Sequence, residues 1–223
     1  MNYDTSAVKP DRAYAPGNIL KGIIFAAFII CFAVTFTLYC RPLYYYDIGH
    51  LQISERSGMD ADTIRKNYDV LIDYNLFWHD EELKFPDFVM SESGKIHFEE
   101  SKALFVFFQY GLIVTLVLSA AIICVQACRR RFAFLKTAGL IAIGLPAVLG
   151  ILLAWNWEWF FVTFHHIAFD NDYWIFDAAT DPVITILPDT FFMHCAVMII
   201  LIVILLGIVS IAAGCIAGRH RGE

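Results

Sequence analysis

Four long uncharged apolar runs constrain the fold of this chain more than any other feature. None of them contains Asp, Glu, Lys or Arg, and they cover residues 22–40, 103–128, 137–157 and 191–218. A helix needs about 20 apolar residues to cross a hydrocarbon core of about 30 Å. Because an isolated strand leaves its backbone groups unpaired in lipid, we expect each run to be a helix. The prediction is an all-α membrane protein with four transmembrane helices.

The composition of the chain excludes an ordinary soluble domain. The 223 residues are 59% hydrophobic and only 17% charged. A soluble domain carries about 25% charged residues, so the shortage of charge agrees with four lipid-embedded runs.

The distribution of Lys and Arg predicts the orientation of the four spans. Segments 1–21, 129–136 and 219–223 lie on one side of a four-span protein and carry nine basic residues together. Segment 158–190 carries none, and segment 41–102 has seven basic but thirteen acidic residues. We therefore expect both termini in the cytoplasm and the last two segments outside the cell membrane.

The first outer segment is predicted to fold as a small extracytoplasmic cap, to which the second outer segment contributes. Its apolar residues recur at helical spacing, at Ile64, Tyr68, Leu71, Ile72 and Leu76. Asp60 and Asp62 precede this pattern and are candidate N-caps.

Titratable groups are absent from the interior of the spans but gather at their outer ends. Pumps and transporters usually carry ionisable groups within the membrane, so we expect any chemistry at the junction with the outer segments. His97 precedes the second span, and His165 and His166 follow the third. If the third span continues as a helix, Phe161 and His165 share one face.

Three stretches of the outer segments match one bacterial membrane family in order and spacing. They read "RPLYYYDIGHLQISERSGMDADTIRKNYDVLIDY", "FPDFVMSESGKIHFEESKALF" and "FHHIAFDNDYWIFDAATDPVITILPDTFF". The chain resembles the lipoprotein intramolecular transacylases, called Lit, from about residue 21 to residue 218. The resemblance implies four transmembrane helices with an extracytoplasmic cap, in the bacterial cytoplasmic membrane.

The same resemblance implies a reaction and its partners. The family moves the sn-2 acyl chain of a diacylglyceryl lipoprotein onto the α-amino group of the same lipidated cysteine, which gives a lyso-form lipoprotein. Partners are then diacylglyceryl lipoproteins and membrane lipid, with no nucleic acid and no cofactor. By motif position the catalytic histidines are His97 and His165. His166 is the alternative to His165. Some relatives have a carboxylate at the position of His166, so its own role stays open.

Two histidines suit this chemistry on physical grounds. An amine that attacks an ester must lose a proton, and the departing alkoxide must gain one. Histidine has an ordinary pKa of about 6.5, so it exchanges protons near neutral pH. One imidazole is expected to act as the base, and the other to stabilise the oxyanion or protonate the leaving oxygen. This requires both rings to converge on one lipid-accessible cavity just outside the membrane.

Aromatic and acidic neighbours are candidates for substrate binding and support. The predicted substrate-binding residues are Phe85, Phe88, Phe98, Tyr173 and Trp174. The candidates for supporting a catalytic histidine are His166 and four carboxylates, Glu99, Glu100, Asp170 and Asp177.

Other readings of the same residues remain open. Histidines with carboxylates can bind zinc, but adjacent histidines diverge by about 100° on a helix, so no metal site is predicted. Ser91 or Ser93 near His97 could act as a covalent nucleophile. A different class of function is a non-catalytic sensor or assembly factor whose cap binds an exported partner.

Overall fold

A computed structural model describes residues 13–219 of the chain, except for the side chains of Leu145 and Arg219. The first twelve residues of the predicted segment 1–21 therefore lie outside the described residues. The same holds for residues 220–223 of the predicted tail, which include His220.

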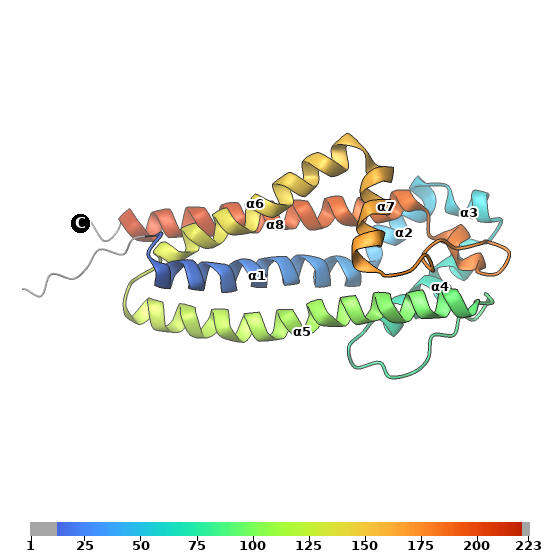
Figure 1. Cartoon of the computed structure of the whole chain (residues 1–223), viewed down its shortest axis with the longest axis horizontal. Coiled ribbons are helices and arrows are strands. Elements are labelled where there is room, and N and C mark those ends of the chain that lie inside the picture. The colour runs from blue at the N-terminus through green and yellow to red at the C-terminus, as the bar shows by residue number, and fades with distance from the viewer. Residues whose placement is uncertain (1–12, 220–223) are drawn as a thin grey trace, which may run out of the picture.

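Four long helices run side by side and make up most of the structure (Figure 1). They are α1 (Pro16–Tyr39), α5 (Glu92–Cys128), α6 (Ala133–Trp155) and α8 (Asp189–Arg219). Each is long and apolar enough to cross a membrane. Residues 13–219 contain no strand, so the all-helical class predicted from the four runs is confirmed.

Helix α5 is longer than a membrane span requires. Its 37 residues extend about 55 Å, against a hydrocarbon core of about 30 Å. The first three turns carry the charged residues Glu92, Lys95, Glu99, Glu100 and Lys102. The apolar part of α5 therefore begins after these turns, and His97 lies on the polar extension.

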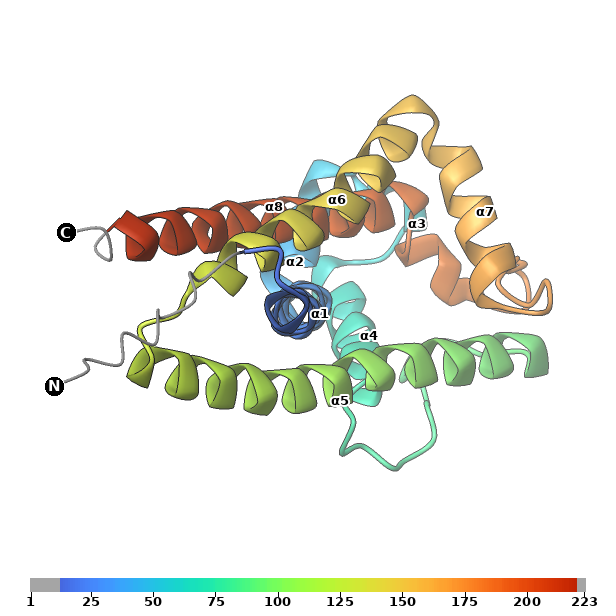
Figure 2. The ribbon, with the colours of Figure 1, turned by 60° about the vertical axis from the view of Figure 1, so that its left-hand side comes forward.

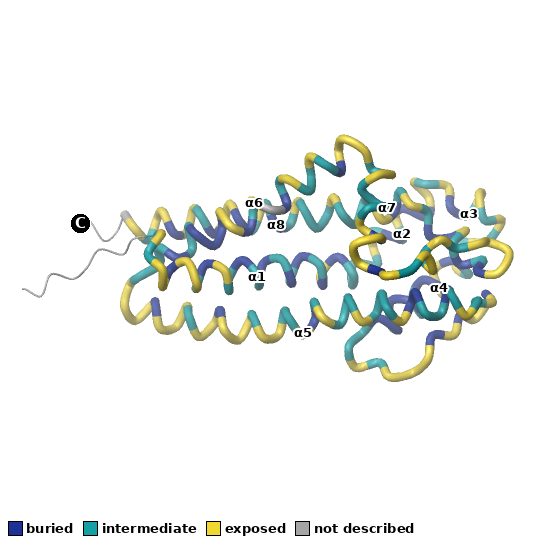
Figure 3. Tube along the Cα trace, viewed as in Figure 1, coloured by how far each residue is buried: buried dark blue, intermediate teal, exposed yellow. Residues whose placement is uncertain are grey.

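Helix α1 is the central helix of the bundle and packs against α5, α6 and α8 (Figure 2). Helices α6 and α8 approach closely where Gly139 meets Gly207, because a Cβ added at Gly139 would lie 2.3 Å from the Gly207 carbonyl oxygen. Small residues commonly permit such contacts between membrane helices. Helix α5 contacts the bundle mainly through α1, and much of its apolar surface is exposed (Figure 3).

Short helices gather at one end of the bundle, opposite the start of α1 and the end of α8 (Figure 1). They are α2 (Arg41–His50), α3 (Ile53–Ser57), α4 (Ala61–Tyr74), α7 (Trp157–Ala168) and the 3₁₀ helix η1 (Pro182–Ile186). We call residues 41–91 and 157–188 the end region.

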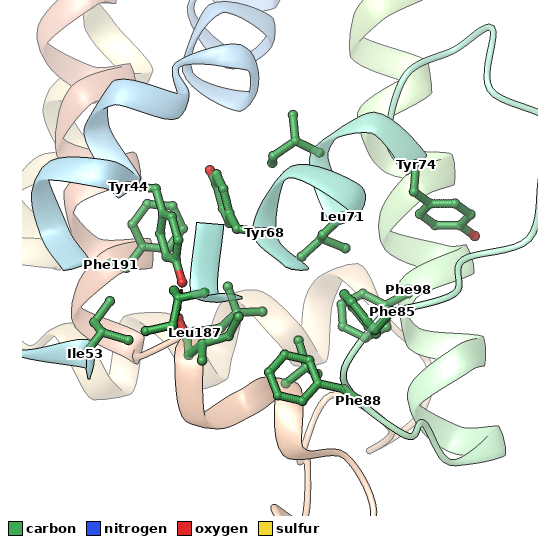
Figure 4. Packing of buried hydrophobic residues seen from close by; sticks show 14 of the residues in the cluster. Tyr44, Ile53, Tyr68, Leu71, Tyr74, Phe85, Phe88, Phe98, Leu187 and Phe191 are labelled. Carbon is green, nitrogen blue, oxygen red and sulfur yellow. Dashed lines mark hydrogen bonds between the residues drawn. The ribbon is translucent and has the colours of Figure 1, made fainter. Parts of the chain in front are cut away.

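A hydrophobic cluster holds the end region together (Figure 4). Tyr44 stacks on Tyr68 with ring centroids 3.7 Å apart, and Phe191 at the start of α8 packs edge-on against both rings. The hydroxyl of Tyr44 donates to the carbonyl oxygen of Ile186 at 2.7 Å. The cluster thus joins both parts of the end region to the start of α8.

Helix α4 is the helix expected from the apolar spacing. Its apolar positions Ile64, Tyr68, Leu71 and Ile72 are buried. Of the two candidate caps, Asp60 is the N-cap, because its carboxylate accepts hydrogen bonds from the backbone N–H groups of Asp62 and Thr63.

The helix of the third run ends at Trp155 rather than continuing to His165. Asn156 adopts an extended backbone conformation, and its side chain accepts a hydrogen bond from the Trp159 N–H at 2.9 Å as the N-cap of α7. The chain therefore turns back toward α5 (Figure 2). Phe161 and His165 still share a face, because α7 is itself helical.

Candidate functional site

His97 of α5 and His165 of α7 lie side by side. Their ring centroids are 6.0 Å apart. Both residues are buried, with 8% of His97 and 9% of His165 exposed. The structure therefore brings together two imidazoles that are far apart in the sequence, and the bend at Asn156 makes this possible.

Aromatic rings surround the two histidines. Phe169 contacts both rings, at 4.8 Å from His97 and 5.7 Å from His165 between centroids. Phe176 lies 5.5 Å from His97, and Trp174 lies 4.6 Å from His165. The segment after α7 thus supplies three rings that cover the pair and exclude water from it.

His165 is held by a backbone hydrogen bond. Its Nδ1 lies 2.8 Å from the carbonyl oxygen of Phe161, one turn earlier on α7. A carbonyl oxygen only accepts, so Nδ1 carries the hydrogen and Nε2 of the neutral ring has a free lone pair. The local helix therefore presents His165 as a base.

His97 has a weaker set of partners. Its Nε2 lies 3.4 Å from the hydroxyl oxygen of Ser101, one turn later on α5. Its Nδ1 is buried and has no hydrogen-bond partner among residues 13–219. One ring nitrogen of His97 is therefore not satisfied by any described residue.

Burial keeps both imidazoles neutral near pH 7. Burial and, to a smaller extent, the nearby His165 together lower the pKa of His97 to about 4. Burial also lowers the pKa of His165, opposed by the hydrogen bond to the Phe161 carbonyl. No carboxylate in the described part of the chain is hydrogen-bonded to either ring, so no acidic partner offsets this desolvation.

The predicted aromatic residues divide into two groups. Phe98 lies 6.1 Å from His97 between centroids, and Trp174 contacts His165. Phe85 packs against both Phe88 and Phe98 in the hydrophobic cluster, and neither Phe85 nor Phe88 has a ring contact with a histidine in the described chain (Figure 4). Tyr173 is 42% exposed and has no ring contact with either histidine within the described residues.

The predicted carboxylates differ in their hydrogen-bond partners and exposure. Glu100 accepts hydrogen bonds from the side-chain amide of Asn171 at 2.9 and 3.1 Å, which ties α5 to the segment after α7. Asp177 accepts from the Ala179 N–H within its own turn. Glu99 and Asp170 are exposed.

His166, Ser91 and Ser93 occupy other environments. His166 is exposed, with its Nδ1 4.0 Å from a carboxylate oxygen of Asp172. The Ser91 hydroxyl accepts from the Gly94 N–H as the N-cap of α5 and lies 2.9 Å from that of Ser93. Among residues 13–219, no group of three His, Cys, Asp or Glu residues is placed to hold a metal ion.

Sequence reasoning missed several residues that build the site: Ser101, Phe161 as a hydrogen-bond acceptor, Phe169, Asn171, Phe176 and Asp181. The spacing of Ser101, four residues after His97, was a readable signal. Buried Asp181 accepts from the Ser91 N–H at 2.8 Å and lies against Gly94, which connects η1 to the first turn of α5. Nothing in the local sequence pairs Asp181 with Ser91.

The comparisons with known proteins agree with this architecture. The profile of the lipoprotein intramolecular transacylase Lit matches residues 19–192. An in meso structure of the membrane-integral lipoprotein intramolecular transacylase Lit from Bacillus cereus is 32% identical to the chain, with a TM-score of 0.89. That match covers 92% of this chain and 95% of the Bacillus chain.

Two variants of the Bacillus protein, in which a histidine is replaced by arginine or alanine, match with TM-scores of 0.81 and 0.82. Both are 32% identical over 92% of this chain, and the matches cover 91% and 93% of the variant chains. No curated protein sequence matches significantly. On the family profile and the shared structure, the chain belongs to the Lit family of lipoprotein intramolecular transacylases, which are acyltransferases.

Proposed function

We propose that this protein moves the sn-2 acyl chain of a diacylglyceryl lipoprotein onto the α-amino group of the same lipidated cysteine, which gives a lyso-form lipoprotein. The observation that carries this proposal is the adjacency of His97 and His165, 6.0 Å apart between ring centroids, in a member of a transacylase family. No other pair of described histidines combines burial with a ring nitrogen that lacks a protein partner.

The reaction requires acid–base chemistry that two neutral imidazoles can supply. A C–N bond forms to the acyl carbon, its C–O bond to the glyceryl oxygen breaks, and one proton moves from the amine to that oxygen. A neutral imidazole can accept this proton, while the second ring stabilises the oxyanion or supplies the leaving oxygen with a proton. Such groups contribute about 10²–10⁴-fold to a rate.

Orientation is the second contribution. The amine and the ester belong to one substrate, and well-placed intramolecular reactions reach effective molarities of about 10⁵–10⁸ M. Phe98, Phe169, Trp174 and Phe176 surround the histidines and are placed to confine the acyl chain.

The proposal places the end region outside the bacterial cytoplasmic membrane as the cap, and both termini in the cytoplasm. The spans are then residues 22–40, 103–128, 137–157 and 191–218. The loop between α5 and α6, with three consecutive arginines, lies at the same end of the bundle as the start of α1 (Figure 1). Basic residues of short loops stay in the cytoplasm, which supports this orientation.

Lipopeptide analysis tests the proposal. The gene is expressed in a strain whose lipoproteins are diacylglyceryl-modified and have free amines, and N-terminal lipopeptides are examined by mass spectrometry. We expect lyso-form peptides with the wild type and none with His97→Ala or His165→Ala. His50→Ala, an exposed residue of α2, is the matched control and should retain conversion. Full conversion by both site variants would reject the two-histidine mechanism, and no conversion by the wild type would favour a non-catalytic sensor or assembly factor.

A further inference from the structure

The hydrogen-bond partners of the two histidines are different in kind. The partner of His165 is a carbonyl, which only accepts, whereas the partner of His97 is a hydroxyl, which can donate. Both rings can therefore carry their hydrogen on Nδ1, but the nitrogen without a partner is then a lone-pair acceptor in His165 (Nε2) and an N–H donor in His97 (Nδ1). The proposed function does not use this difference.

Ser101 is free to donate to His97. A serine within a helix commonly donates to the carbonyl of residue i−4. The Ser101 hydroxyl instead has the Nε2 atom of the i−4 side chain, His97, as its one hydrogen-bond partner in the described chain. The distance of 3.4 Å is long, and catalytic hydrogen bonds of ligand-free enzymes often shorten when substrate binds.

The reaction needs one proton acceptor and one hydrogen-bond donor. His165 supplies the acceptor at Nε2. A lone pair on the remaining nitrogen of His97 would repel the oxyanion, whereas an N–H would stabilise it. Nδ1 of His97 has no partner in the described chain and is shielded from solvent, so its hydrogen can be given to a substrate that displaces the surrounding rings on entering.

We propose that Ser101 is a positioning residue that donates to Nε2 of His97 and thereby fixes the hydrogen of His97 on Nδ1. In this arrangement, which rests on the proposed function, His97 stays neutral and stabilises the oxyanion through Nδ1–H. His165 removes the proton of the attacking amine at Nε2 and returns it to the glyceryl oxygen as the C–O bond breaks. Each atom and proton is accounted for, and His97 never passes through an imidazolate.

Burial supports the neutral state that this role needs. With a pKa of about 4, His97 does not become an imidazolium near neutral pH. It therefore stabilises the oxyanion by a hydrogen bond and does not transfer a proton to it. Neutral imidazole can act in this way toward a developing oxyanion.

Kinetics on the full-length protein give the first test. We expect Ser101→Ala to lower kcat roughly 3- to 10-fold, with KM changed less than 2-fold, since one hydrogen bond acting on a catalytic ring is lost. Ser101→Thr keeps a hydroxyl and should recover most of kcat. Ser119→Ala removes a buried hydroxyl from the same helix far from His97 and should leave kcat unchanged. An unaltered kcat in Ser101→Ala, or no recovery in Ser101→Thr, would overturn the proposal.

Nitrogen NMR gives a test that needs no turnover. Protein labelled with ¹⁵N-histidine is measured in detergent at neutral pH, and the signals of His97 are identified by their loss in His97→Gln. We expect the wild type to carry the hydrogen on Nδ1 and Ser101→Ala to show both tautomers. A hydrogen on Nε2 in the wild type, or an unchanged spectrum in Ser101→Ala, would overturn the proposal. Failure of the proposed function is recognised separately, by absence of lyso-form product from the wild type.

Discussion

Two histidine environments in this protein differ in the kind of partner that the ring has. His194, at the start of α8, lies with its Nδ1 2.8 Å from a carboxylate oxygen of Asp47 on α2, and Asp47 is fully buried. Within residues 13–219, the hydrogen-bond partner of His97 is a hydroxyl and that of His165 is a carbonyl. The Asp47 carboxylate holds His194 in a contact between two helices, whereas His97 and His165 each have one ring nitrogen without a partner in the described chain. Under the proposed function, the histidine paired with an acid is structural and the two histidines without an acidic partner are catalytic.

The largest expected effect separates the two members of the site pair. His165→Gln removes the base and should lower kcat by about 10²–10⁴-fold. His97→Gln retains an N–H donor on its side chain, so it should lose at least tenfold less activity than His165→Gln. Quantitative mass spectrometry of lyso-form product measures both. Equal losses in the two variants would show that the histidines act alike.

The next largest effect is a loss of stability in a variant of His194. In His194→Ala the Asp47 carboxylate loses its one side-chain hydrogen bond in the described structure, since its other oxygen already has no partner. Leaving a buried charge uncompensated costs about 3–5 kcal/mol of unfolding free energy. Thermal unfolding in detergent should show the loss, while the folded fraction keeps its activity. His97→Ala should instead lose activity while its unfolding midpoint changes less than that of His194→Ala. Comparable unfolding midpoints for the two variants would contradict the distinction.

The pH dependence should distinguish the site from an ordinary histidine. The pKa of His165 is lowered in the folded protein, so the base stays neutral at and below its usual pKa of about 6.5. Activity should therefore hold down through pH 6.5 and fall about tenfold per pH unit only below the lowered pKa. A pH–rate profile of kcat/KM checks this, and a midpoint at or above 6.5 would contradict it.

The same shifts predict how stability changes with pH. The unfolded chain binds more protons than the folded one between the folded pKa of His97, about 4, and its unfolded value of about 6.5. The free energy of unfolding should therefore rise with pH through this window and lose this dependence above it. His97→Ala should flatten the slope, which a series of unfolding midpoints would reveal.

The smallest effect concerns the segment that covers the site. Asn171→Ala removes the two hydrogen bonds to Glu100 that tie this segment to α5. Because Glu100 is only partly buried, we expect a 3- to 10-fold fall in kcat/KM, which corresponds to one ordinary hydrogen bond of about 0.5–1.5 kcal/mol. Thr185→Ala, in the exposed part of the same outer segment, is the control. Unchanged kinetics would show that the tie does not position the rings.

The residues of the site show how far the sequence could be read. His97 and His165 were identified by their places in family motifs, and Phe98 and Trp174 by their aromatic character next to them. The hydroxyl of Ser101, four residues after His97, was readable from helical spacing and was overlooked. Asn171 and Asp181 were beyond reach, because their partners lie on α5 and the pairing depends on how two distant segments pack.

The sequence by itself determined the class of this protein. The length of its uncharged runs dictates membrane-spanning helices, and the spacing of apolar residues dictates α4, because both depend on neighbours along the chain. Only the tertiary structure decided that α6 ends at Trp155, that Phe85 and Phe88 pack in the hydrophobic cluster, and that the imidazoles of His97 and His165 meet. These outcomes depend on contacts between residues far apart in the chain, and their energies arise only when the helices have packed.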